Sequence, residues 1–147
     1  MKLSLQEIQG IQMECRDLVE RFAVYSDSAR YEQLAALFIE QGSFARPTEP
    51  DRPVVGRTAI LDAMNRRPAE RVTRHLCSNI IIDVIDTDNA IGKSYVVLYT
   101  GNTNQPAERF GLQADPVRLV GEFDDEFVRT SAGWRFSKRS GKVVFTG

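Results

Sequence analysis

Apolar residues near the start of the chain recur at the spacing of an α-helix. From about Ser4 to Tyr25 they lie three and four positions apart, at Ile8, Ile11, Cys15, Leu18, Phe22 and Tyr25. This spacing predicts a single helix with one apolar face. Ser4 and Glu7 are three residues apart and form the pattern of a capping box, which would begin the helix.

Two shorter helices are predicted after it. A helix over residues 29–40 would have Leu34, Leu37 and Phe38 on its inner face and would end at Gly42. An extended piece over 43–46 and a loop with several prolines follow. A third helix over 57–65 has apolar residues at helical spacing and would be closed by Pro68.

The second half of the chain has the composition of β-strands. Segments rich in β-branched and aromatic residues are separated by turn residues, and they predict strands over 72–86, 90–100, 117–129 and 134–145. The polar stretch 101–116 is long enough to be a lid or a subunit contact. Three helices followed by a four-stranded antiparallel meander predict an α+β domain, with the helices on one face of a curved sheet.

Composition limits the class of protein. The chain has 147 residues, 42% of them hydrophobic and 27% charged, which is typical of one soluble domain spanning 1–147. We expect no membrane segment and no secretory signal, and a net charge of −1 gives no reason to expect nucleic acid as a partner. Cys15 and Cys77 have no metal-ligand spacing, so we expect two reduced thiols in a cytoplasmic protein. With one histidine in the chain, we expect neither a metal site nor a cofactor.

The basic residues are strongly biased towards arginine. Of 19 basic residues four are lysine, which leaves 15 arginines, and four of these lie close together at Arg66, Arg67, Arg71 and Arg74. This cluster could bind an anion. Solvated arginines that pair with surface acids are the favoured interpretation, because runs of charge usually mark a solvated face.

The order of several short motifs resembles a known family. The motifs are Tyr31–Phe38 leading into Gly42, Gly56-Arg57, Thr73-Arg74-His75 with Asn79, Gly121–Asp125 and Gly133–Phe136. In this order they resemble the polyketide-cyclase (SnoaL-like) branch of the nuclear transport factor 2-like superfamily. The resemblance implies a cone-shaped α+β barrel, in which three N-terminal helices pack on a strongly bent antiparallel sheet. It also implies a small hydrophobic ligand in the mouth of the cone and a homodimer or higher homo-oligomer.

The resemblance places an acid–base pair at Asp27 and His75, because the dehydratase-like members carry an aspartate and a histidine at the matching positions. In those enzymes the aspartate orients the imidazole, which removes a proton next to a carbonyl and then protonates the departing hydroxyl. Two structural alternatives stay open: Asp27 could cap the second helix, and His75 could be a hydrogen-bonded interior residue.

Strand alternation supplies further candidates. Leu119, Gly121, Phe123, Asp125 and Phe127 share one face, so Asp125 would be a buried carboxylate that is either paired or catalytic. Asn79 shares a face with His75 and could bind a substrate oxygen, although closing an irregularity in the sheet is the favoured role. Tyr25 could polarise a carbonyl, although core packing is favoured. The remaining candidates for the wall of the pocket and the core are Phe22, Phe38, Phe44, Met64 and Phe123. Tyr95 and Tyr99 share a face that could line the cone or a subunit contact.

The sequence therefore supports two function classes. The first is a cofactor-independent lyase or isomerase that acts on a small hydrophobic, cyclic carbonyl compound through Asp27 and His75, with Asp125 as the acid or base in a cyclase-like variant. The second is a ligand-binding or assembly module without chemistry, resembling the β subunit of aromatic-ring dioxygenases.

Overall fold

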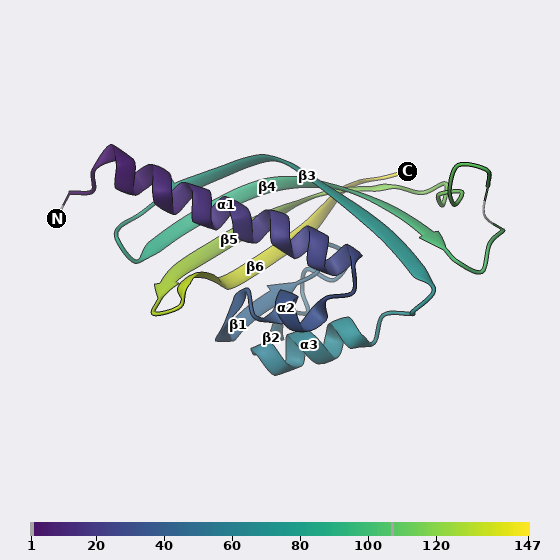
Figure 1. Cartoon of the computed structure of the whole chain (residues 1–147), viewed down its shortest axis with the longest axis horizontal. Helices are drawn as coiled ribbons and strands as arrows, with labels where there is room; N and C mark the ends of the chain where they lie inside the picture. Colours follow the sequence, from purple (N-terminus) through teal and green to yellow (C-terminus); the bar gives the residue numbers. More distant parts are fainter. Residues whose placement is uncertain (1, 107) are drawn as a thin grey trace.

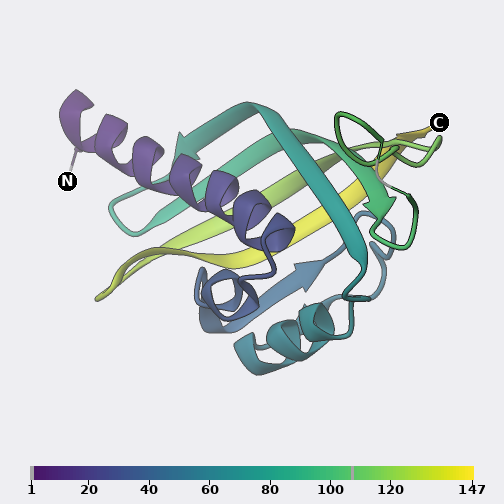
Figure 2. The same ribbon diagram turned by 45° about the vertical axis from the view of Figure 1, so that its right-hand side comes forward.

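A computed structural model describes residues 2–106 and 108–147, and in it helices pack against one strongly curved sheet (Figures 1 and 2). The helices are α1 (Leu5–Asp27), α2 (Tyr31–Ala35) and α3 (Arg57–Asn65). The strands are β1 (Phe38–Ala45), β2 (Val54–Val55), β3 (Arg71–Val84), β4 (Asn89–Asn102), β5 (Leu119–Thr130) and β6 (Gly133–Thr146). The expected α+β fold, with helices on a bent sheet, is confirmed.

The sheet has six strands in the order β2-β1-β6-β5-β4-β3 and does not close into a full barrel. Strands β3 to β6 form the predicted antiparallel meander, whereas β1 pairs with β6 in parallel and β2 pairs with β1 antiparallel. The long helix α1 lies across one face of the sheet, and α2 and α3 lie beside β1 (Figure 2). This curvature leaves a hollow between the helices and the concave face.

Helix α1 begins as the sequence predicts and ends two residues later than expected. Ser4 Oγ accepts a hydrogen bond from Glu7 N at 3.1 Å, and Ser4 N donates to Glu7 Oε2 at 2.7 Å, which completes the capping box. The apolar face buries Ile11, Cys15, Leu18, Val19 and Phe22 against the sheet. Because the helix continues to Asp27, this residue lies in its last turn.

The prediction of a second helix to residue 40 is wrong. The helix ends at Ala35, and residues 38–45 form strand β1. Phe136 N donates to Leu37 O at 2.8 Å, and Phe38 pairs with Phe136 across the parallel β1–β6 ladder. Tertiary pairing with β6 therefore outweighs the local helical pattern. Gly42, expected to end a helix, is a buried residue of this strand.

A cluster of aromatic rings fills the space between α1 and the sheet. Phe22 lies 5.1 Å from Phe44 and 6.2 Å from Phe136 between ring centroids, and Phe38 lies 5.1 Å from Phe136. Burial of each such side chain stabilises the fold by about 1.5–3 kcal/mol. Phe38, predicted to line the pocket, is instead fully buried in this cluster.

Two of the β-bulges in the sheet, one on β3 and one on β6, change which side chains face inward. On β3 the register shifts between Ser78 and Ile81, and Asn79 there has a positive φ of 53°. On β6 it shifts opposite Glu126 and Phe127, where Ser137 is the extra residue. Each bulge reverses the inward and outward alternation that follows it.

Strand β3 is one edge of the sheet, and two side chains of α1 bind its backbone. Asp27 Oδ2 accepts a hydrogen bond from His75 N at 2.9 Å, and Gln12 Nε2 donates to Ile82 O at 3.1 Å. Helix α1 therefore contacts β3 through polar groups as well as through the core. Within the described residues, no helix has the length and apolar character needed to span a bilayer.

Candidate active site

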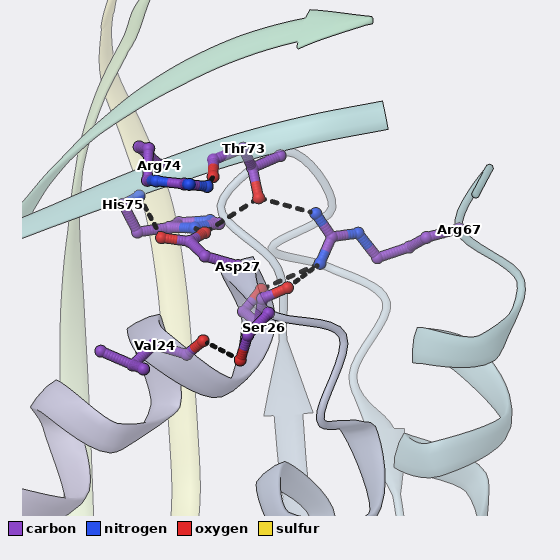
Figure 3. Close-up of polar contacts among 8 residues, drawn as sticks. Val24, Ser26, Asp27, Arg67, Thr73, Arg74 and His75 are labelled. Atoms are coloured by element: carbon purple, nitrogen blue, oxygen red, sulfur yellow. Dashed lines mark hydrogen bonds and ion pairs between the residues drawn. The ribbon is translucent and has the colours of Figure 1, made fainter. Parts of the chain in front are cut away.

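Asp27 and His75 are brought together by the packing of α1 on β3 (Figure 3). Asp27 Oδ1 lies 2.6 Å from His75 Nδ1, and both side chains are mostly buried. Thr73, two residues before His75 on the same face of β3, donates from its hydroxyl to Asp27 Oδ1 at 2.9 Å. The carboxylate thus fixes the ring and the strand that carries it.

The environment of Asp27 favours its charged form. Burial raises the pKa of this carboxyl, but the hydrogen bonds from the His75 ring and backbone, the charge of His75 and the Thr73 hydroxyl together lower it below its ordinary value of 3.8. A carboxylate that binds Nδ1 leaves Nε2 as the ring nitrogen available to a ligand.

The alternative that Asp27 caps the second helix is wrong. The N-cap position of α2 is Arg30, which makes no capping hydrogen bond from its side chain. The Asp27 side chain instead forms its hydrogen bonds with Thr73 and His75 on β3.

His75 lines a cavity of about 180 Å³ between α1 and the concave face of the sheet. Much of the wall is apolar and comes from α1, β1, α3, β4 and β5: Phe22, Phe44, Met64, Val96, Leu98 and Phe123. Of the residues predicted to bind substrate, Phe22, Phe44, Met64 and Phe123 lie in the wall of this cavity. A cavity of about 150 Å³ lined by aliphatic and aromatic side chains binds benzene, so this one is large enough for a single substituted ring.

The same cavity is also lined by arginines that come from two parts of the chain: Arg46, Arg67 and Arg71, the arginine group. Arg67 Nη1 donates to Ser26 Oγ at 2.9 Å, and its Nη2 donates to Thr73 Oγ1 at 3.3 Å (Figure 3). Arg46 Nη2 donates to Ala63 O at 3.0 Å. The solvated interpretation of the arginine cluster is therefore wrong for Arg67, which is half-buried. Arg71 is exposed but lines the cavity, whereas Arg66 and Arg74 are exposed and lie outside the cavity wall.

Asp125 is buried, as strand alternation predicts, and it faces a buried arginine. Its Oδ2 lies 3.4 Å from Arg139 Nη1, and both side chains are about 1% exposed. Burial raises the pKa of Asp125 to about 6, against the opposing charge of Arg139. The Arg139 guanidinium stacks 3.8 Å from the centroid of Phe123, whose ring lines the cavity. Asp125 therefore lies behind the cavity wall.

Three predicted binding residues are not in the cavity wall, and the physical reason differs for each. Tyr25 is half-buried and packs against the core, while Arg21 Nη1 donates to its phenol oxygen at 2.8 Å. Phe38 belongs to the aromatic core. Asn79 is exposed, because the bulge turns it and Ile81 away from the concave face. Tyr95 and Tyr99 lie on the exposed outer face of β4.

Several polar residues of the site were not predicted. Thr73 could have been found, because a residue two positions before His75 shares its face. Arg139 could not be found by alternation, because the bulge at Ser137 reverses the phase and turns Arg139 inward. Arg46 follows a short strand that the sequence identifies only as an extended piece. Among the described residues, no three His, Cys, Asp or Glu side chains gather as metal ligands.

Comparisons with known proteins agree with this architecture. A crystal structure assigned provisionally as a scytalone dehydratase from Novosphingobium aromaticivorans superimposes with a TM-score of 0.80 at 22% identity, over 97% of this chain and 91% of that one. A hexachlorocyclohexane dehydrochlorinase, LinA type 2, gives a TM-score of 0.81 at 18% identity, over 98% and 92%. At such identities these likenesses establish the fold alone, and no curated protein sequence matches the chain.

The family itself is established by sequence. The model of the SnoaL-like domain matches residues 11–140, which is most of the chain and includes Asp27, His75 and every residue of the arginine group. The chain therefore belongs to the SnoaL-like domain family.

Proposed function

We propose that this protein is a cofactor-independent lyase or isomerase that acts on a small hydrophobic, cyclic carbonyl compound, with Asp27 and His75 as its acid–base pair. One observation carries the proposal. His75 lines an apolar cavity while its Nδ1 is held 2.6 Å from a buried carboxylate, so Nε2 is left to a ligand.

The chemistry follows from this arrangement. His75 Nε2 takes a proton from the carbon next to the carbonyl, and the electron pair of the broken C–H bond forms an enolate. Asp27 stabilises the positive imidazolium that results. In a dehydration, the same proton then passes to a hydroxyl on the adjacent carbon, which leaves as water as the double bond forms. In an isomerisation, the proton returns to a different carbon of the substrate.

Two features of the surroundings support this reaction class. Both side chains of the pair are mostly buried, which strengthens the contact between Asp27 and the imidazolium. Proteins of the same fold include a provisionally assigned scytalone dehydratase and a hexachlorocyclohexane dehydrochlorinase, whose names describe lyase chemistry.

Exchange of ketone protons with deuterated water tests the proton-abstraction step without knowledge of the true substrate. Cyclic ketones and β-hydroxy ketones are incubated with the protein, and loss of the α-proton signal is followed by NMR. We expect Asp27→Asn and His75→Gln each to reduce the catalysed rate by about 10²–10⁴-fold. Asp17→Asn, on the same helix but exposed and paired with Arg21, is the matched control and should keep the rate.

The outcomes separate the acid–base candidates. Loss of exchange in Asp125→Asn but not in His75→Gln would assign the reaction to the cyclase-like alternative. Equal rates in the wild type and both Asp27→Asn and His75→Gln would contradict the pair.

A second candidate is an assembly module without chemistry. It is favoured by exposed apolar side chains on the outer face of the meander, among them Leu76, Ile91 and Tyr95. A protein provisionally assigned as an aromatic ring hydroxylase, also from Novosphingobium aromaticivorans, has the same fold with a TM-score of 0.76 at 16% identity, over 99% of this chain and 95% of that one. Purification of the protein from its native cells with a larger subunit, together with no exchange activity in either state, would support this candidate.

A further inference from the structure

We propose that the ligand of this cavity carries a carboxylate, which the arginine group binds while the rest of the ligand occupies the apolar part beside His75. The inference rests on the proposed function only in requiring that the cavity holds a small molecule.

The first argument is the local balance of charge. Arg46, Arg67 and Arg71 line one cavity, although the whole chain has a net charge of −1. Among the described residues, none of the three is within ion-pair distance of an acid, even though six ion pairs form elsewhere. The charge of Glu49 raises the pKa of Arg46, but Glu49 and Arg46 do not form an ion pair. Arg46 and Arg67 are half-buried, and half-buried charges are normally paired in proteins, so the missing partner is an anion from outside the chain.

The second argument is the electrostatic environment of Arg46. Burial and the neighbouring charges of Arg67, Arg71 and Arg66 lower the pKa of its guanidinium, while Glu49 opposes them. The three cations therefore repel one another in the free protein. A bound anion would remove this repulsion.

The third argument is the supply of free hydrogen-bond donors. A guanidinium has five N–H groups. Arg46 uses one nitrogen on Ala63 O, and Arg67 uses its two terminal nitrogens on Ser26 and Thr73. The Arg71 side chain forms no hydrogen bond within the described parts of the chain, and it is exposed where the cavity opens. Arg71 is therefore free to form the paired, parallel hydrogen bonds that a planar carboxylate accepts.

The size of the cavity selects the kind of anion. About 180 Å³ holds one ring and a compact head group. Because Arg67 is linked through Thr73 to Asp27 and His75, a ligand held by the arginine group would present its ring to His75. The assigned class is a cyclic or aryl carboxylate.

Binding of matched probes tests the assignment. Benzoate and cinnamate are compared with benzamide and cinnamamide, which have the same shape and no charge, at a pH near neutrality. His75 is the only histidine, so its ring proton signal in the NMR spectrum reports occupancy of this cavity without assignment. We expect each carboxylate to bind at least about tenfold more tightly than its amide.

Variants identify the residues responsible. Arg71→Gln should reduce the preference for the carboxylate to about threefold, and the double variant Arg46→Gln/Arg71→Gln should abolish it. Arg66→Gln removes the same charge from the same segment but lies outside the cavity wall, so it should keep the preference. A preference that survives in the double variant would show that groups other than Arg46 and Arg71 bind the anion and would overturn the proposal, as would equal binding of acids and amides or no binding of either.

Two further results separate this inference from neighbouring ones. Tighter binding of phenyl phosphate than of both carboxylates would overturn the assignment to carboxylates. Exchange of ketone protons that depends on Asp27, in a protein that shows no preference for carboxylates, would leave the proposed function standing and reject the inference. A clear preference for carboxylates without such exchange would leave the inference standing and reject the proposed function.

Discussion

Asp27 holds His75 through both oxygens of its carboxylate. Oδ1 lies 2.6 Å from the ring Nδ1, and Oδ2 accepts a hydrogen bond from the backbone N–H at 2.9 Å. The two residues are 48 positions apart, so the pair exists only when α1 is packed on β3. This arrangement sets both the direction of the ring and which of its nitrogens carries the proton.

The tautomer of His75 is the first prediction. In the neutral ring we expect the proton on Nδ1, where Asp27 accepts it, and Nε2 without a proton. Correlation spectra that link ring protons to ring nitrogens distinguish the two tautomers directly. Asp27→Leu should shift the ring towards the Nε2-protonated form that is common in solution, and an unchanged tautomer in this variant would contradict the role given to Asp27.

The stability of the protein should depend on pH through Asp27. Because the folded carboxyl has a lowered pKa, the unfolded chain binds more protons in the window below 3.8, and stability rises with pH across that window. The contribution of Asp27 is therefore complete above 3.8 and is lost as the pH falls below it. Urea unfolding of the wild type and Asp27→Asn should give a larger difference in unfolding free energy at about pH 6 than at about pH 3. An equal difference at both values would contradict the assignment.

The buried pair of Asp125 and Arg139 should behave as a structural unit. Asp125→Ala leaves the Arg139 charge buried without its partner and should cost about 3–5 kcal/mol of unfolding free energy. The double variant Asp125→Leu/Arg139→Met replaces both groups with apolar ones and should recover most of this loss. If the double variant is as unstable as Asp125→Ala, the loss comes from packing and not from the unpaired charge.

Gly141 should be required for the shape of the cavity wall. A Cβ at this position would lie 2.6 Å from Pro47 Cγ and 2.8 Å from Pro47 N, and Pro47 lines the cavity. We expect Gly141→Ala to destabilise the protein by about 1–3 kcal/mol and to weaken ligand binding. Gly10→Ala is the matched control, because a Cβ there meets nothing within 4 Å and lies in α1. It should stabilise the protein by about 0.5–1 kcal/mol, and thermal unfolding measures both.

Asn79 should act through its backbone conformation. Its φ of 53° lies in the left-handed region, which glycine adopts without strain. Asn79→Gly should leave both stability and catalysis close to the wild type, whereas Asn79→Val should cost about 1–2 kcal/mol. A loss of catalysis in a stable Asn79→Gly variant would instead indicate that the Asn79 side chain binds substrate.

Sequence patterns were sufficient to predict those elements that depend on residues close together in the sequence. The capping box at Ser4 and the bounds of α3 follow from residues near in sequence, and both are confirmed. Strand β1 was mistaken for helix because its identity depends on pairing with β6, almost a hundred residues later. No property of residues 36–40 alone reveals that partner.

The residues of the candidate site also divide into those that local sequence patterns predict and those that they do not. Alternation along β5 placed Phe123 and Asp125 inward, because no bulge interrupts that stretch of the strand. Alternation failed at Asn79 and could not find Arg139, since one extra residue on β3 and one on β6 reverse its phase. The arginine group depends on the meeting of β1, α3 and β3, which brings Arg46 close to residues more than twenty positions away.

The contact between Asp27 and the backbone of β3 has a consequence for solubility. An edge strand with free N–H and C=O groups can pair with a strand of another molecule and begin aggregation. In this fold Asp27 and Gln12 occupy two of those groups on β3. A variant that loses the Asp27 carboxylate without an acceptor to replace it would expose the His75 amide to such pairing. The residue proposed for catalysis therefore also occupies part of a strand edge that would otherwise be free to pair.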